Sequence, residues 1–212
     1  MSPMPKSVIR AFQFRYAVLF AFFAACLGTA APAHATVDEA KTFVEGLANQ
    51  TLEILQDKDA APEARREKFA TLFKSGADLN RIGRFVLGRY AKQMKAENRL
   101  QEYQALFREY VVNIYAKRLG QYSGETFDIT GANAVNEKEV MVNSNIQSDS
   151  SKFRVDWQVR NSGQGYKIVD VRIEGISMAL EQREQFVSFI NNNGKQVSAL
   201  IDFLKGELQQ PT

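Results

Sequence analysis

The sequence predicts an α+β fold in which a curved antiparallel sheet of four strands is covered on one face by helices. Three observations support this prediction. Apolar residues recur with helical spacing up to about residue 117, four strand-like segments follow without a helix between them, and helical spacing returns after residue 177. The strands are expected to be antiparallel because their connections are too short for the crossover that parallel neighbours need.

Residues 1–35 are predicted to form a cleaved export signal. Basic residues precede an apolar run over residues 16–27, and Ala33-His34-Ala35 provides the small side chains of a cleavage site. The apolar run is shorter than the roughly 20 residues that a membrane-spanning helix needs. We therefore expect a mature chain of residues 36–212 that folds as one domain.

Cleavage would leave few of the groups that enzymes and metal sites use. It would remove the only cysteine, Cys26, and the only histidine, His34. The mature chain would then have no thiol nucleophile, no serine–histidine pair, no disulfide and none of the usual zinc ligands. It would carry 24 basic and 24 acidic residues, since three of the 27 basic residues and none of the 24 acidic ones lie in the signal. We expect no metal site, no cofactor and no nucleic-acid partner.

Two amphipathic helices are expected first. From Val37 to about Asp57, apolar residues recur at steps of three and four, which is typical of a helix with one buried face. Pro62 suits the first turn of the second helix, which ends near Gly76. Both helices are expected to be ordinary core elements.

The next segment, residues 78–99, has a strong excess of positive charge. Asp78 can cap a short helix, which Gly83 and Gly88 are expected to interrupt. From position 81 onward, Glu97 is the only acidic residue against six basic ones. The segment is either a solvated helix face or a surface that contacts anionic headgroups or an acidic partner. Arg89 could instead brace the fold through a buried ion pair. The candidate contact residues are Arg81, Arg84, Arg89 and Lys92.

A longer helix is predicted from about Asn98 to Lys117, and its apolar face is broad and aromatic. Such a face usually packs against a sheet, but tyrosines, which have an apolar ring and a polar tip, can also line the mouth of a cavity. The face consists of Leu100, Tyr103, Phe107, Tyr110, Val111, Ile114 and Tyr115.

The four predicted strands are separated by asparagine, serine and glycine residues that favour turns, including Asn133 and Asn136. In the third strand, valine and aromatic residues alternate with polar ones, as expected for a strand with one buried face. The segments are Thr126–Ile129, Glu139–Gln147, Lys152–Asn161 and Tyr166–Glu174.

The chain is predicted to return to helix after the last strand. Ser177 can cap a helix that ends at the stop signal Asn193-Gly194. A final amphipathic helix then includes Val197 and Leu204 at helical spacing. These two helices are expected to cover the sheet.

Several short motifs occur in a distinctive order. They are Leu87-Gly88-Arg89-Tyr90, Tyr122-Ser123-Gly124-Glu125, the pattern V-D-V-x-x-E-G-I-S at residues 169–177, and then Gln182-Arg183, Phe186, Ile190, Gly194 and Leu200-Ile201. Together they resemble the MlaC family of periplasmic phospholipid-binding proteins, also known as the toluene-tolerance family. The resemblance covers nearly all of the mature chain.

This resemblance implies a soluble, monomeric periplasmic carrier whose cargo is a phospholipid. The acyl chains would lie in an internal apolar cavity between helices and sheet, although periodicity alone does not separate a cavity from a solid core. The implied partners are an outer-membrane lipoprotein complex and an inner-membrane ABC transporter complex, and the implied role is to maintain outer-membrane lipid asymmetry. The candidate lipid-binding residues are Leu87, Tyr90, Phe107, Val111, Ile114, Val142, Val155, Trp157 and Val171.

Three other functions are compatible with the same pattern. The cargo could be a hopanoid or another envelope lipid. The domain could be a hydrolase that uses carboxylates such as Asp156 and Asp170, but both alternate with apolar residues and are expected on the solvated face of the sheet. The domain could also be a purely structural interaction module that binds no lipid. We expect a carrier and no catalytic residue.

Overall fold

The computed structural model describes residues 36–118, 124–148 and 151–209. The predicted export signal and the motif residues Tyr122 and Ser123 lie outside these ranges. No helix in the described part is both long and apolar enough to cross a membrane. In chain order the elements are α2 (Val37–Gln56), α3 (Pro62–Gly76), α4 (Leu79–Val86), the 3-10 turn η1 (Gly88–Tyr90), α5 (Ala91–Ala96), α6 (Leu100–Arg118), β1 (Thr126–Asn136), β2 (Glu139–Gln147), β3 (Lys152–Asn161), β4 (Tyr166–Ile173), β5 (Ile176–Ser177), α7 (Met178–Asn192) and α8 (Val197–Gln209).

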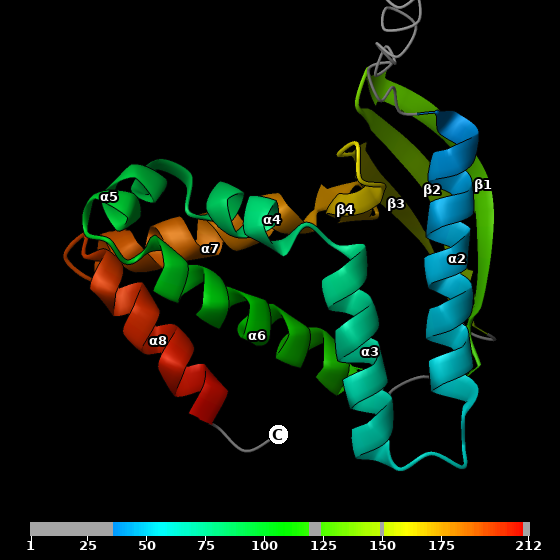
Figure 1. The fold of residues 1–212 in the computed structure, drawn as a ribbon, viewed down its shortest axis with the longest axis horizontal. Helices are drawn as coiled ribbons and strands as arrows, with labels where there is room; N and C mark the ends of the chain where they lie inside the picture. The colour runs from blue at the N-terminus through cyan, green and yellow to red at the C-terminus, as the bar shows by residue number, and fades with distance from the viewer. Residues whose placement is uncertain (1–35, 119–123, 149–150, 210–212) are drawn as a thin grey trace, which may run out of the picture. The chain divides into compact units, whose positions relative to one another are not determined.

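The predicted α+β architecture is confirmed, but the antiparallel sheet has five strands rather than four. Strands β1 to β5 pair in chain order, so each strand lies beside its neighbour in sequence (Figure 1). The fifth strand, β5, folds back onto β4 through Glu174 and Gly175, which have φ angles of 50° and 84°. Ser177 then caps α7, as expected, by accepting a hydrogen bond from the Leu180 amide.

Strand β1 is longer than the sequence predicted. We expected it to end at Ile129, with Asn133 in a turn, but it continues to Asn136. Two register shifts against β2, near Thr130 and Val135, interrupt the regular pairing, and bulges of this kind also bend a sheet. The turn follows at Asn136, whose side-chain oxygen accepts a hydrogen bond from the Lys138 amide at 3.0 Å.

Helix α4 confirms one expectation and corrects another. Asp78 caps it by accepting a hydrogen bond from the Arg81 amide at 2.9 Å. Gly83 lies inside the helix and does not interrupt it. Its missing side chain leaves room for the Phe107 ring, since a Cβ at this position would lie 2.9 Å from that ring. Gly88 does end the regular helix, because its φ of 53° is one that glycine adopts at little cost.

Two groups of buried side chains hold the domain together. We call the first the sheet core; it packs α2 against the apolar side of the sheet. Figure 1 shows α2 lying along the sheet. We call the second the helical core; it packs the helices α4, α5, α6, α7 and α8 against one another. The sheet core comprises Ala40, Val44, Val140, Val142 and Val159. The helical core comprises Val86, Leu87, Tyr90, Met94, Tyr103, Phe107, Phe186, Ile190, Val197, Leu200, Ile201 and Leu204.

A buried carboxylate connects α4 to the sheet. Glu139 on β2 is 6% exposed and accepts hydrogen bonds from Arg160 Nη1 at 2.6 Å and Gln158 Nε2 at 2.8 Å. Arg81 Nη2, on α4, lies 3.5 Å from the same carboxylate. One of the basic residues that we considered for docking therefore has a partner within the fold.

Glu139→Gln is expected to lower the free energy of unfolding by about 1–3 kcal/mol at pH 7, because Arg160 loses its charged partner. Burial raises the pKa of Glu139, but hydrogen bonds from Arg160, Gln158 and Asn136 outweigh burial, so the pKa lies below its ordinary value of 4.5. The stabilisation is therefore complete above pH 4.5 and is lost as the pH falls through the folded-state pKa.

Urea unfolding of the variant and the wild type at pH 7 and below pH 4.5 tests this expectation. The difference between the two proteins should shrink at the lower pH. Glu137→Gln, at an exposed position in the neighbouring turn, should change little at either pH. An equal loss for Glu139→Gln at both pH values would contradict the proposed charge interaction.

Candidate functional site

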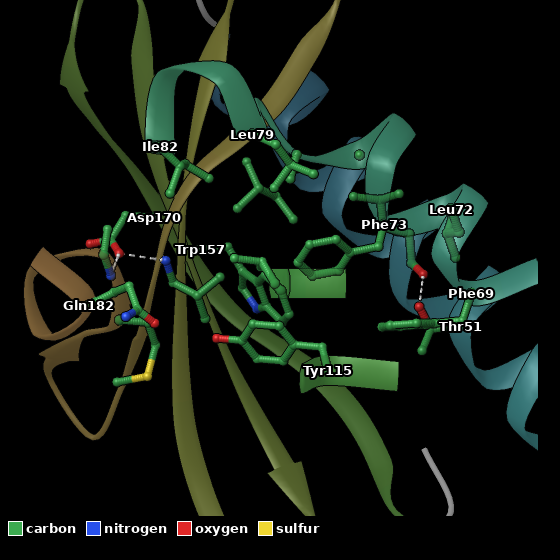
Figure 2. A pocket seen from close by; sticks show the side chains of 18 of the residues that line it. Thr51, Phe69, Leu72, Phe73, Leu79, Ile82, Tyr115, Trp157, Asp170 and Gln182 are labelled. Atoms are coloured by element: carbon green, nitrogen blue, oxygen red, sulfur yellow. Dashed lines mark hydrogen bonds between the residues drawn. The ribbon is translucent and has the colours of Figure 1, made fainter. Parts of the chain in front are cut away.

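An apolar cavity of about 240 Å³ lies where the helical core and the sheet core meet. Side chains from five helices and two strands form its wall, and Figure 2 shows them converging on the space. Nearly all are apolar; the polar exceptions are Thr51, Tyr115, Asp170 and Gln182. The wall consists of Leu47, Ala48, Thr51, Phe69, Leu72, Phe73, Gly76, Ala77, Leu79, Ile82, Val86, Phe107, Val111, Tyr115, Trp157, Ile168, Asp170, Val171, Ile173, Met178, Ala179 and Gln182.

Trp157 and Val171 form much of the sheet side of this wall. They are paired across β3 and β4, and their alternation with polar residues directs them to the apolar side of the sheet. Trp157 Nε1 donates a hydrogen bond to Ser144 Oγ at 2.9 Å, and Ser144 Oγ donates to the Val155 carbonyl at 2.8 Å. The Phe127 ring meets the indole edge to face, with centroids 6.2 Å apart. The indole is therefore held on two sides.

Aromatic rings of α3 and α6 form the opposite wall. Phe73 stacks on Tyr115 with ring centroids 5.4 Å apart, and Phe69 lies 5.8 Å from Phe73. The C-terminal end of α3 is attached to β4, because the Asp78 amide donates to the Ile168 carbonyl at 2.9 Å. The wall that faces the sheet therefore consists of large aromatic rings, and the end of α3, which carries two of them, is hydrogen-bonded to β4.

The one carboxylate in the wall, Asp170, is used within the fold. Its Oδ1 accepts hydrogen bonds from the Val171 amide at 2.9 Å and from the Ala179 amide, in the first turn of α7, at 3.1 Å. A negative charge at this end of a helix is stabilising. Asp156 is also mostly buried, with 7% exposed, and accepts a hydrogen bond from Asn143 Nδ2 at 2.8 Å. Our expectation that both carboxylates are solvated is therefore wrong.

The structure places the nine predicted lipid-binding residues in three environments. Phe107, Val111, Trp157 and Val171 line the cavity. Leu87 and Tyr90 are packed in the helical core, and Val142 is packed in the sheet core. Val155 is buried and Ile114 is partly buried, but neither lines the cavity. The periodicity that identified all nine marks a buried face and does not identify the positions that border a void.

Sequence reasoning missed the part of the wall that α2 and α3 provide. Leu47, Phe69 and Phe73 lie on the two helices that were expected to be ordinary core elements. The clustering of phenylalanines on α3 was the available signal. It is weak, because the same rings are equally common in solid cores.

The four basic candidates also differ in their surroundings. Arg81 lies beside Glu139, and Arg89 donates to Asn191 Oδ1 while its guanidinium lies 5.2 Å from the centroid of the Tyr90 ring. Arg89 is exposed and its partner is a neutral amide, so the buried ion pair considered for it is not formed. Arg84 and Lys92 are exposed and form no ion pair within the described residues.

Comparisons with known proteins agree with this architecture. The Toluene tolerance protein ttg2D of Pseudomonas putida is 23% identical over 121 residues, which are 57% of this chain and 56% of that protein. The chain therefore spans only about half the length of this curated relative. A solved structure of the phospholipid-binding protein from Ralstonia solanacearum, in complex with a phospholipid, matches with a TM-score of 0.69 at 22% identity. That match covers 80% of this chain and 96% of the solved chain, and it establishes a common fold. Residues 45–206 match the family model described as MlaC protein, and because this match covers most of the sequence, the chain belongs to the MlaC family.

Proposed function

We propose that this protein is a periplasmic phospholipid carrier that holds acyl chains in the cavity between its two cores. The observation that carries the proposal is the cavity itself, which is lined almost entirely by apolar side chains in a domain of the MlaC family. The Ralstonia solanacearum protein of the same fold was solved with a phospholipid, which supports a lipid as the occupant.

Physical chemistry explains why such a carrier is needed. A phospholipid has about 30 methylenes, and at ~0.8 kcal/mol each their exposure to water costs more than ~20 kcal/mol. The cavity of about 240 Å³ is smaller than the roughly 300–1,000 Å³ that is usual for ligand pockets. A phospholipid can therefore load only if the cavity enlarges. Exchange is expected to occur while the carrier is docked.

That this chain belongs to the MlaC family supports a role between two membranes. We propose that residues 1–35 direct export and are removed, and that the mature monomer exchanges lipid with an outer-membrane lipoprotein complex and an inner-membrane ABC transporter complex. Such exchange would maintain the lipid asymmetry of the outer membrane.

The mature protein, purified without detergent, is expected to carry about one phospholipid per chain. Native mass spectrometry gives the stoichiometry, and organic extraction identifies the lipid. A hopanoid or another envelope lipid in the extract would change the proposed cargo but would still support a carrier function. The absence of extractable lipid, together with failure to take up any from vesicles, would overturn the carrier proposal.

We further expect Arg84 and Lys92 to contribute to docking or headgroup contact. Reversing both to glutamate should slow lipid transfer to partner-containing membranes several-fold and reduce its salt dependence, since exposed charges mainly change encounter rates. The melting temperature should not change. Arg81 is left intact because it lies beside Glu139.

The matched control reverses Lys58 and Lys138, two exposed residues outside the basic segment. Transfer rates at two salt concentrations should then resemble those of the wild type. Unchanged transfer at low salt for the Arg84 and Lys92 variant would show that these charges only solvate the surface.

A further inference from the structure

Trp157 marks the point along the sheet at which the cavity ends. Among the described residues, it is the only residue of β3 that lines the cavity, whereas β4 contributes four and β1 and β2 contribute none. On the other side of Trp157 lie the buried Val140 and Val142 of the sheet core, both with no exposed surface. The indole therefore separates a hollow region over β4 from a close-packed region over β2.

Two neighbours on the packed side determine the position of this ring. The Ser144 hydroxyl, which is fully buried, accepts the indole N–H at 2.9 Å and is itself oriented by donating to the Val155 carbonyl at 2.8 Å. Phe127 packs edge to face against the indole. A ring whose N–H donates to a fully buried hydroxyl keeps the orientation that satisfies this bond, because breaking it would leave polar groups inside the fold without a partner.

We propose that Trp157, held by Ser144, sets how far an acyl chain can extend over the sheet and thereby determines the chain-length preference of the carrier. This proposal rests on the proposed phospholipid-binding function. A chain that is too long meets a ring that cannot move without losing its hydrogen bond, and a chain that is too short leaves an empty space beside it. Trp157 is the specificity-determining residue, and Ser144 is its positioning residue.

The test compares two lipids that share a headgroup. Delipidated mature protein is incubated with phosphatidylglycerol vesicles containing equal amounts of dilauroyl and dipalmitoyl species, and native mass spectrometry gives the ratio of the two one-to-one complexes. Trp157→Leu should shift this ratio toward the longer lipid by about tenfold or more, because each methylene that fits an apolar pocket changes affinity by roughly tenfold or more. Val112→Ala, which shortens a side chain at a buried position on α6 outside the cavity wall, should leave the ratio within about twofold of the wild type.

Ser144→Ala should shift the ratio in the same direction by a smaller factor, because the ring remains but can rotate. Trp157 is the only tryptophan of the chain, so a change in its fluorescence emission and in its quenching by acrylamide reports that freedom directly. Trp157→Phe, which retains an aromatic ring, provides the same length test if the leucine variant does not fold.

The outcomes separate this inference from the function on which it rests. A wild-type protein that takes up neither lipid overturns the carrier proposal and this inference with it. Variants at Trp157 that bind one lipid per chain with an unchanged ratio overturn the inference alone. An equal shift for Val112→Ala also overturns it, since a general loosening of the packed core rather than the position of Trp157 would then determine the preference.

Discussion

Ala48→Trp and Val171→Trp are each expected to reduce lipid loading to less than about a tenth of the wild-type level in a protein that remains folded. Both side chains line the cavity, so the added indole occupies the space proposed for acyl chains. Tryptophan is well tolerated in strands, and alanine to tryptophan in a helix costs less than about 1 kcal/mol in propensity. Loading is measured by native mass spectrometry after incubation with phospholipid vesicles, and folding by circular dichroism.

Val142→Trp is the matched control. Val142 and Val171 are the two residues paired with Trp157, one on each neighbouring strand, but Val142 has no exposed surface and lies in the sheet core. We therefore expect Val142→Trp to destabilise the protein by about 1–3 kcal/mol through overpacking, although the sequence analysis placed Val142 among the candidate lipid-binding residues. Full loading of both Ala48→Trp and Val171→Trp would show that the lipid binds elsewhere.

Phe107→Ala is expected to have the largest effect on stability, a loss of about 3–5 kcal/mol. The ring is 1% exposed and lies between Tyr103 and Phe186, at centroid distances of 5.8 and 6.3 Å. It also fits against Gly83, where α4 has no side chain. Because the ring borders the cavity, the space left by truncation joins an existing void and is not expected to collapse.

Urea and thermal unfolding measure this effect, and the melting temperature should fall by roughly 10 °C for a domain of this size. Val111→Ala, one turn further along α6 and also in the cavity wall, should cause a smaller loss because it removes fewer buried carbons. A loss below about 1 kcal/mol for Phe107→Ala would show that the ring does not connect the helical core to the cavity wall.

Local chemistry in the sequence was sufficient to predict most elements and their ends. Asp78 and Ser177 cap helices as expected, because a side-chain oxygen satisfies the first free amides of a helix wherever the helix packs. Strand β3 matches its predicted bounds, since alternation reports a buried face directly. Strand β1 was predicted too short because its continuation past Ile129 depends on hydrogen bonds to β2 and on two bulges, which no local preference indicates.

The cavity could not be located from the sequence. Val142 and Val171 are the same residue type, on the same face of the sheet and on either side of Trp157, yet one lies in a packed core and the other borders the void. The side chains that pack over each position make the difference: valine and alanine of α2 pack in the sheet core with Val142, whereas large rings of α3 and α6 line the cavity with Val171. Which side chains meet across the layers is a tertiary property, so both positions give the same periodic signal.

For the basic residues, too, the sequence shows how many there are, and the fold decides which of them are exposed. The excess of basic residues between positions 78 and 99 was evident from the sequence alone. Which of these residues is available to a partner was decided by the fold, because Arg81 meets Glu139 from 58 positions away, Arg89 meets Asn191 from 102 positions away, and Arg84 and Lys92 remain exposed. A charged side chain acquires its partner only when the layers pack, and this packing separates docking candidates from residues that stabilise the domain.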